Sequence, residues 1–300
     1  MSAQSKLTQG QFRRLSHVLW VVIALLASGA AAFGQELSLP QVDVAADYCE
    51  SIRSGVQNPQ PLVDACNFVL SLTEHLPNVI CDQKTSRYVR PAPGIFDERL
   101  IDIVTAHVIY EDGVERYSDI KINGQPSPQS INHLAGQSTR GEFGTDLMFA
   151  FSSQNHPLYR YLREEKVSGR PSFVYEARIA HENNRSWTVH TATRLTYPEY
   201  VADIWVDQAN HKILRLDLNL IPQLDFPLSD IEVHTDYRNL PLGDGTRFVL
   251  PVKSRSSSCL WDDLKRKIVS CTANVLVFNN CHKFGATSRI LTDGTNNSQK

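Results

Sequence analysis

Alternating hydrophobic and polar positions run through most of residues 78–281, and a period of two is typical of β-strands. The segment "ILRLDLNL" at 213–220 alternates most regularly, because every even-numbered position in it is leucine. Successive side chains of a strand point to opposite faces of its sheet. We therefore expect a single aliphatic face made of Leu214, Leu216, Leu218 and Leu220, with Trp205 on the neighbouring strand.

The same reading, combined with turn signals such as Asp112-Gly113 and Gly243-Asp244-Gly245, predicts eleven strands. They cover residues 78–90, 99–111, 114–123, 158–167, 171–182, 185–192, 200–207, 211–220, 228–238, 247–259 and 269–281. Because most of them follow one another through short turns, we expect a mainly antiparallel, meandering sheet.

Helical spacing of apolar residues occurs in the segments before this region and in one insertion within it. Residues 42–52 and 59–76 repeat at helical intervals, and prolines at 59, 61 and 77 suit the start and the end of the second helix. The insertion at 125–157 contains "GEFGTDLMFAF", a short apolar run with Phe149 and Phe151, and we expect it to form a helical lid.

The first 34 residues have the layout of a signal peptide. Arg13 and Arg14 precede an apolar run from Val18 to Ala32, which ends in small residues. The run has about 15 residues, and a membrane-spanning helix needs about 20. We therefore expect cleavage after Ala32 or Gly34, a soluble product in the periplasm or outside the cell, and a disordered tail at 291–300.

Charge and cysteine content narrow the possible classes of protein. Removal of the signal peptide takes away three of the 30 basic residues and none of the 32 acidic ones, which leaves a net charge of −5 and argues against a nucleic-acid binder. All six cysteines lie in the exported part, where disulfides form. Cys259 and Cys271 flank a charged hairpin turn, so we expect a cross-strand disulfide between them. The pairing of Cys49, Cys66, Cys81 and Cys281 stays open.

Catalytic motifs are missing from the sequence. It contains no G-x-S-x-G, C-x-x-C, phosphate loop or H-E-x-x-H, and "HENNR" at 181–185 lacks the second histidine of a zinc motif. Cys281 and His282 are adjacent, but neighbours on a strand point to opposite faces, so His282 does not suit the role of base for Cys281. We expect no enzyme, no metal and no cofactor.

One hairpin resembles a known family. "DIWVDQANHKILRLDL" at 203–218 is similar to the W-[IV]-D-x-x-[ST]-x-x-[ILV]-x-[RK] hairpin of the periplasmic lipoprotein carriers LolA and LolB, with Trp205, Asp207 and Arg215 at matching positions and Asn210 or His211 in the Ser/Thr place. Four further stretches, at 110–126, 141–147, 245–254 and 274–290, resemble exported soil-bacterial proteins whose function is not established. The resemblance implies an α+β fold in one domain at 35–290, a curved half-barrel of about 11 strands with amino-terminal helices and a helical lid.

The resemblance also implies a function. A half-barrel leaves a concave face that can hold a lipid, an acyl chain or a lipid-modified segment. The candidate cavity residues are Leu214, Leu216, Leu218, Leu220, Trp205, Phe149 and Phe151, and packing of the same residues in a closed core is the competing interpretation. We expect a monomeric carrier. The alternative is a periplasmic sensor or regulatory domain that binds an envelope protein.

Overall fold

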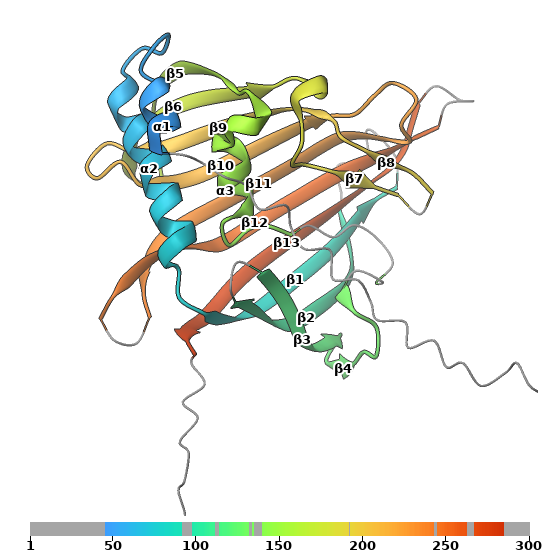
Figure 1. The fold of residues 1–300 in the computed structure, drawn as a ribbon. Helices are drawn as coiled ribbons and strands as arrows, with labels where there is room; N and C mark the ends of the chain where they lie inside the picture. The colour runs from blue at the N-terminus through green and yellow to red at the C-terminus, as the bar shows by residue number, and fades with distance from the viewer. Residues whose placement is uncertain are drawn as a thin grey trace, which may run out of the picture. The chain divides into compact units, whose positions relative to one another are not determined.

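An open antiparallel sheet of eleven strands organises the part of the chain that the computed structural model describes, which is residues 46–91, 98–111, 114–131, 134, 140–191, 193–242, 245–262 and 267–284 (Figure 1). Its strands are β1 (Val79–Arg90), β2 (Arg99–Glu111), β3 (Val114–Ile122), β4 (Gln125–Pro126), β5 (Leu158–Val167), β6 (Arg170–Ile179), β9 (Glu199–Asp207), β10 (Ile213–Ile221), β11 (Leu228–Pro241), β12 (Arg247–Asp262) and β13 (Lys267–Lys283). The proposed signal peptide and the tail at 291–300 lie outside the described residues.

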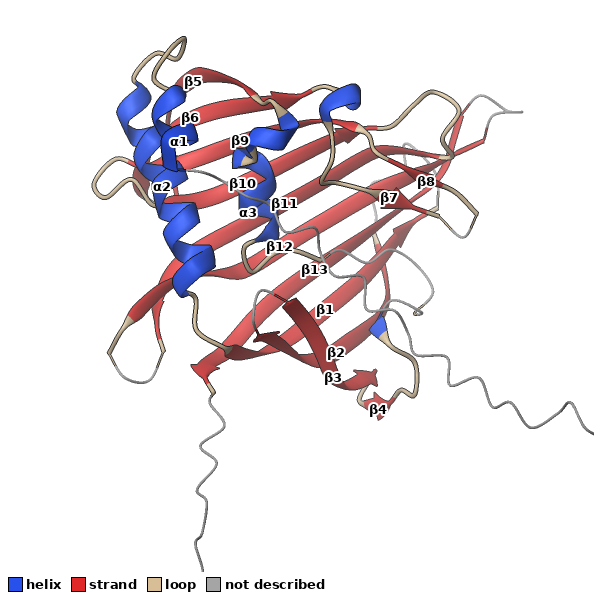
Figure 2. Ribbon diagram, viewed as in Figure 1, coloured by secondary structure: helices blue, strands red, loops and turns tan. Residues whose placement is uncertain are grey.

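The order of strands across the sheet is β4-β3-β2-β1-β13-β12-β11-β10-β9-β6-β5, and every neighbouring pair is antiparallel. Most neighbours are consecutive in the chain, as a meander predicts. The exception is β1, which lies between β2 and β13. Among the described strands β4 and β5 form the two edges, so the sheet is a curved half-barrel and the expected α+β class is confirmed (Figure 2).

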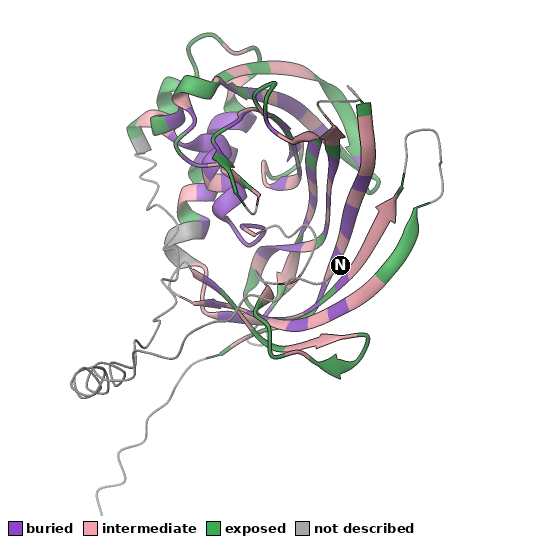
Figure 3. Ribbon diagram, turned by 90° about the vertical axis from the view of Figure 1, so that its right-hand side faces the viewer, coloured by how far each residue is buried: buried purple, intermediate pink, exposed green. Residues whose placement is uncertain are grey.

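Three helices lie on the concave face of the sheet: α1 (Ala46–Ser51), α2 (Pro59–His75) and α3 (Thr145–Phe151) (Figure 3). Helix α2 begins at Pro59, whose missing N–H costs nothing at a helix start, and ends before Pro77, which disfavours helical geometry in the preceding Leu76. Its buried stripe of Leu62, Val63, Cys66 and Val69 packs against the sheet. The predicted helices at 59–76 and in the lid are therefore confirmed.

The predicted strand at 185–192 is wrong as a member of the large sheet. Only β7 (Val189–His190) pairs, and its partner is the two-residue β8 (Leu195–Thr196) in a separate ribbon. The side chain of Asn184 explains the loss, because its Oδ1 accepts hydrogen bonds from the backbone amides of Ser186 and Trp187 at 3.0 and 2.9 Å. Such local bonds replace the ladder bonds that a strand needs.

Three disulfides use all six cysteines: Cys49–Cys66, Cys81–Cys281 and Cys259–Cys271. The predicted cross-strand pair is confirmed, since Cys259 and Cys271 lie directly opposite each other on β12 and β13. Cys49–Cys66 links α1 to α2, and Cys81–Cys281 links β1 to β13. Disulfides form and persist in oxidising compartments.

Among the helices of the described residues, none has the length and apolar character that crossing a membrane requires.

Candidate functional site: a slot between β10 and β11

A β-bulge at the start of β10 changes the face to which Leu214 belongs. The register with β9 pairs Ile213 with Val206 and then Arg215 with Trp205, so that Leu214 is an extra residue opposite Trp205. An extra residue of this kind shifts the alternation by one position. Leu214 therefore packs with Trp205, Val174 and Val167 on the convex side, and the expectation that it shares a face with the other leucines is wrong.

The remaining leucines of β10 lie in the main core on the concave side. Leu216, Leu218 and Leu220 are each at most 2% exposed and belong to the cluster that contains the stripe of α2. Phe151 of α3 belongs to the same cluster, whereas Phe149 packs edge-on against Trp187. Helices α1, α2 and α3 thus occupy the concave face at these positions. That these leucines and phenylalanines line a ligand cavity stays a prediction.

A second feature of β10 and β11 does leave space: the two strands separate at one end. Their ladder begins with Leu220 opposite Ile231 and stops with Arg215 opposite Asp236. Beyond this pair, β11 continues to Pro241 alongside β12 alone, and a bulge between Asp236 and Tyr237 accompanies the separation. The sheet is therefore split between the β9–β10 turn and the hairpin that joins β11 to β12.

The split contains a cavity of about 430 Å³, which we call the slot. Apolar parts of six residues line it: Val167, Ile213, Leu214, Tyr237, Leu240 and Val249. Small-molecule sites typically enclose about 300–1,000 Å³ with mostly apolar walls and a few polar groups. The volume and the lining of the slot fall within this range. Of the seven predicted cavity residues, only Leu214 lines it directly.

The turn beside the slot is fixed by Asp207, the acid of the hairpin motif. Its Oδ1 accepts hydrogen bonds from the amides of Ala209 and Asn210 at 2.8 and 3.2 Å, and its Oδ2 lies 2.5 Å from Arg170 Nε. Burial alone would raise the pKa of Asp207, but Arg170 and the two amides outweigh burial and leave the pKa below its ordinary value. The ionised carboxylate thus holds the β9–β10 turn against the β5–β6 turn.

The same turn is also attached to helix α2. His211 Nδ1 lies 2.6 Å from Asp64 Oδ2, and Lys212 Nζ lies 5.6 Å from the centre of the Phe68 ring. One wall of the slot is consequently fixed to the helix that covers the concave core.

Two buried polar atoms of the slot residues have no hydrogen-bond partner among the described residues, Tyr237 Oη and Asn239 Oδ1. Tyr237 is 3% exposed, and its pKa is raised well above its ordinary value by burial and by the negative charges of Asp146, Glu142 and Glu115. These three acids lie in or beside the lid and are themselves buried. Tyr237 therefore contributes a protonated, buried hydroxyl group to the slot.

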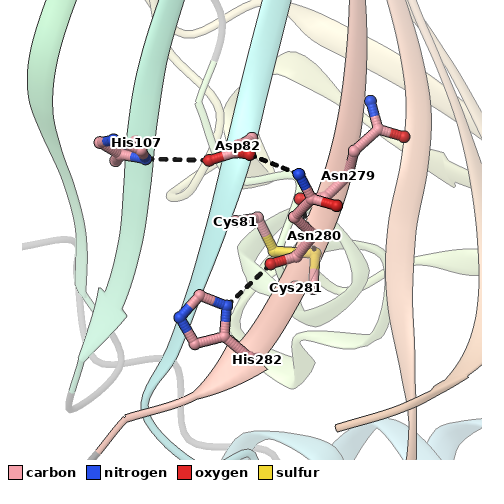
Figure 4. The surroundings of a disulfide bond; sticks show 7 residues. All are labelled: Cys81, Asp82, His107, Asn279, Asn280, Cys281 and His282. Carbon is pink, nitrogen blue, oxygen red and sulfur yellow. Dashed lines mark hydrogen bonds and ion pairs between the residues drawn. A yellow bond between two sulfur atoms is a disulfide. The ribbon is translucent and has the colours of Figure 1, made fainter.

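The residues considered for catalysis do not form a catalytic constellation. Cys281 has no thiol, because it is bonded to Cys81 (Figure 4). His282 Nδ1 lies 2.8 Å from the carbonyl oxygen of Asn280 (Figure 4). His181 lies in a short 3₁₀ helix, with Nδ1 2.5 Å from the carbonyl oxygen of Tyr197.

Within the described ranges, no group of three or more histidine, cysteine, aspartate or glutamate residues has the geometry to hold a metal ion.

The similarities of this chain to known proteins come from solved structures. No family model matches the chain, and no curated protein matches it. Among solved structures, the chain is similar to a LolA superfamily protein from Nitrosomonas europaea, with 13% identity, coverage of 74% of this chain and 94% of the other, and a TM-score of 0.32. It is similar to a DUF1329 family protein from Desulfovibrio piger, with 12% identity, coverage of 76% and 95%, and a TM-score of 0.33. A third similar structure is the Mycobacterium tuberculosis lipoprotein LppX, with 12% identity, coverage of 77% and 100%, and a TM-score of 0.29.

Proposed function

We propose that the chain is an exported, non-enzymatic carrier that binds a lipid, an acyl chain or a lipid-modified segment, with the slot between β10 and β11 as its binding site. The observation that carries this proposal is the separation of the two strands beyond Arg215 and Asp236, because it opens an apolar space in a sheet that is otherwise paired. Burial of apolar area supplies affinity at about 25 cal/mol per Å².

The concave face is closed by packed side chains, and this favours the slot as the binding site. A ligand between the leucines of β10 and helix α2 would have to displace side chains that are at most 2% exposed. The slot already exists without such displacement. Ile213 and Leu214 give the slot an apolar wall on β10.

Export supports the same proposal. The signal-peptide layout of residues 1–34 and the use of all six cysteines in disulfides both fit an oxidising compartment outside the cytoplasm. Amino-terminal sequencing of the mature protein should give a start at Phe33 or Gln35. Recovery of the chain with Met1 intact in a membrane fraction would contradict this part of the proposal.

The carrier function is tested with a fluorescent fatty acid and a charge placed in the slot. Leu214→Glu should abolish binding and lower stability only slightly, because Leu214 is partly exposed at an existing space. Leu158→Glu is the matched control, since Leu158 is 73% exposed at the other end of β5 from the slot residue Val167. Unchanged binding by Leu214→Glu, or no binding by the wild type, would reject the slot.

A second candidate function, a regulatory domain that binds a protein partner, is favoured by an exposed apolar patch. Leu195, Tyr197, Ile221 and Leu224 are between 42% and 100% exposed. The ion pair of Arg194 with Asp225 and the contact of Thr196 with Gln223 bring their two segments together. Exposed apolar patches often mark interaction surfaces. Native mass spectrometry of the exported protein distinguishes the candidates, because a co-purified lipid supports the carrier and a stoichiometric protein supports the regulator.

A further inference from the structure

The mouth of the slot carries an excess of positive charge. Four basic residues line it, Arg170, Lys212, Arg238 and Arg247, together with a single carboxylate, Asp236. The carboxylate is already engaged, because its Oδ1 lies 2.7 Å from Arg215 Nε. The chain as a whole has a net charge of −2, so this concentration of cations is local.

The four cations differ in how far their charge is already neutralised. Arg170 is paired with Asp207, and Arg247 donates to the carbonyl oxygen of Asn239 at 2.6 Å without an ion pair to any of the described residues. Arg238 and Lys212 make no ion pair with any of the described residues. Three of the four cations are therefore available to an anion from outside the chain.

The slot offers different surfaces to a charged head group and to an apolar chain. Its four basic residues attract an anion. Its aliphatic residues, which include Ile213, Leu214 and Val249, accept an apolar chain. A bound amphiphile therefore places its charged head beside the cations and its chain against the aliphatic wall.

We propose that the slot selects single-chain amphiphiles with an anionic head group, a carboxylate or a phosphate, which Arg238 and Arg247 bind at the mouth while the chain enters beside Leu214. This inference rests on the proposed function and adds the chemical class of the ligand. Guanidinium groups form two parallel, charge-assisted hydrogen bonds with either kind of head. Lys212 adds a third positive charge at the β9–β10 turn.

The test compares two ligands of the same chain length, hexadecanoate and hexadecanol, by displacement of a fluorescent fatty acid from the intact mature protein. We expect the wild type to bind the carboxylate at least about tenfold more tightly than the alcohol, as charge-assisted bonds predict. The double variant Arg238→Gln/Arg247→Gln should lose this preference and keep its affinity for the alcohol. Arg160→Gln is the control, because Arg160 is exposed on β5 and paired with Glu176 outside the slot.

Two further ligands, hexadecyl phosphate and inorganic phosphate, distinguish an amphiphile site from a simple anion site. The full set of results also distinguishes failure of this inference from failure of the carrier function. Hexadecyl phosphate should bind as the carboxylate does, and inorganic phosphate alone should not displace the probe. Equal wild-type affinities for acid and alcohol would overturn the inference and leave the carrier function standing. Displacement of the probe by inorganic phosphate at equal concentration would contradict an amphiphile as the ligand and indicate a simple anion site. Absence of binding by every chain-bearing ligand would overturn the carrier function itself.

Discussion

Arg215 Nε lies 2.7 Å from Asp236 Oδ1, and the two residues form the last directly opposed pair of the β10–β11 ladder. On one side of this pair the strands are hydrogen-bonded, and on the other side they diverge around the slot. The ion pair is therefore both the end of the ladder and one border of the proposed binding site. Its guanidinium also lies 5.8 Å from the centre of the Trp205 ring, which fixes its position further.

A double-mutant cycle on Arg215 and Asp236 should give a coupling of about 0.5–1 kcal/mol in the free energy of unfolding. Both side chains are less than a quarter exposed, so their attraction is screened less than that of a surface pair. The pair Arg160–Glu176, whose arginine is 66% exposed, is the reference and should give a smaller coupling. Urea denaturation of the four variants of each cycle measures both values. Equal couplings would mean that burial of the Arg215 pair contributes nothing.

Leucine truncations should separate the closed core from the slot. Leu216→Ala removes a side chain that is 1% exposed among α2 and the sheet, and should cost about 2–5 kcal/mol of stability. Leu214→Ala should cost less, because Leu214 is only partly buried, and should weaken binding of a fluorescent fatty acid. Thermal melts and the binding assay on both variants test this. If the folded Leu216→Ala variant loses more binding than Leu214→Ala, the binding site is on the concave face.

Protonation of Asp146, which is buried in the lid helix α3, should make the free energy of unfolding depend on pH. The pKa of Asp146 is raised well above its ordinary value by burial and by the nearby charges of Glu142 and Glu115, and its Oδ1 has no hydrogen-bond partner among the described residues. The folded state then binds a proton that the unfolded state has released. Stability from this group is consequently present below the unfolded pKa and is lost as the pH rises toward the folded pKa.

Asp146→Asn should remove that loss, so the variant gains stability at neutral pH relative to the wild type and shows a flatter pH profile. Each unit by which the pKa is raised corresponds to about 1.4 kcal/mol. Chemical denaturation at about pH 5 and about pH 8 measures the difference, with the exposed Glu182→Gln as control. Parallel profiles for the wild type and Asp146→Asn would show that Asp146 is ionised throughout.

Removal of the disulfides should have unequal effects. Cys81–Cys281 joins residues 200 positions apart, and Cys259–Cys271 joins residues 12 apart. A link across a longer loop restricts the unfolded chain more, with about 4.7 kcal/mol expected for a 100-residue loop and about 3 kcal/mol for 15 residues. The double serine variant at 81 and 281 should therefore unfold at a lower urea concentration than the one at 259 and 271. The reverse order would indicate that native contacts around the hairpin decide.

Much of the fold could be predicted from the alternation of residues in the chain. The ranges 99–111 and 158–167 coincide with β2 and β5, because both strands run from one clear turn signal to the next. The strand at 185–192 failed, since Asn184 satisfies backbone amides locally and nothing in a hydropathy pattern reveals such a bond. The neighbourhood of β1 and β13 also escaped prediction, because sequence order gives no register between distant strands.

The slot was missed for a related reason. A bulge adds one residue without changing the composition of a strand, so the regular leucines of 214–220 concealed the shift at Leu214. The hairpin segment 236–247 gave no charge signal either, because Asp236 and Asp244 balance the charges of Arg238 and Arg247. Their meeting at a cavity depends on where β11 leaves β10, which is a property of the assembled sheet.

The placement of β1 beside β13 governs the order in which this protein can fold. Val79 pairs with Lys283, so the middle of the sheet stays incomplete until β13 has joined β1. Closing so long a loop is slow, and during the delay β1 and β12 present unpaired edges that can join other chains. Fragments that stop before β13 should therefore aggregate instead of forming smaller domains, and a holding chaperone should raise the yield of the complete chain.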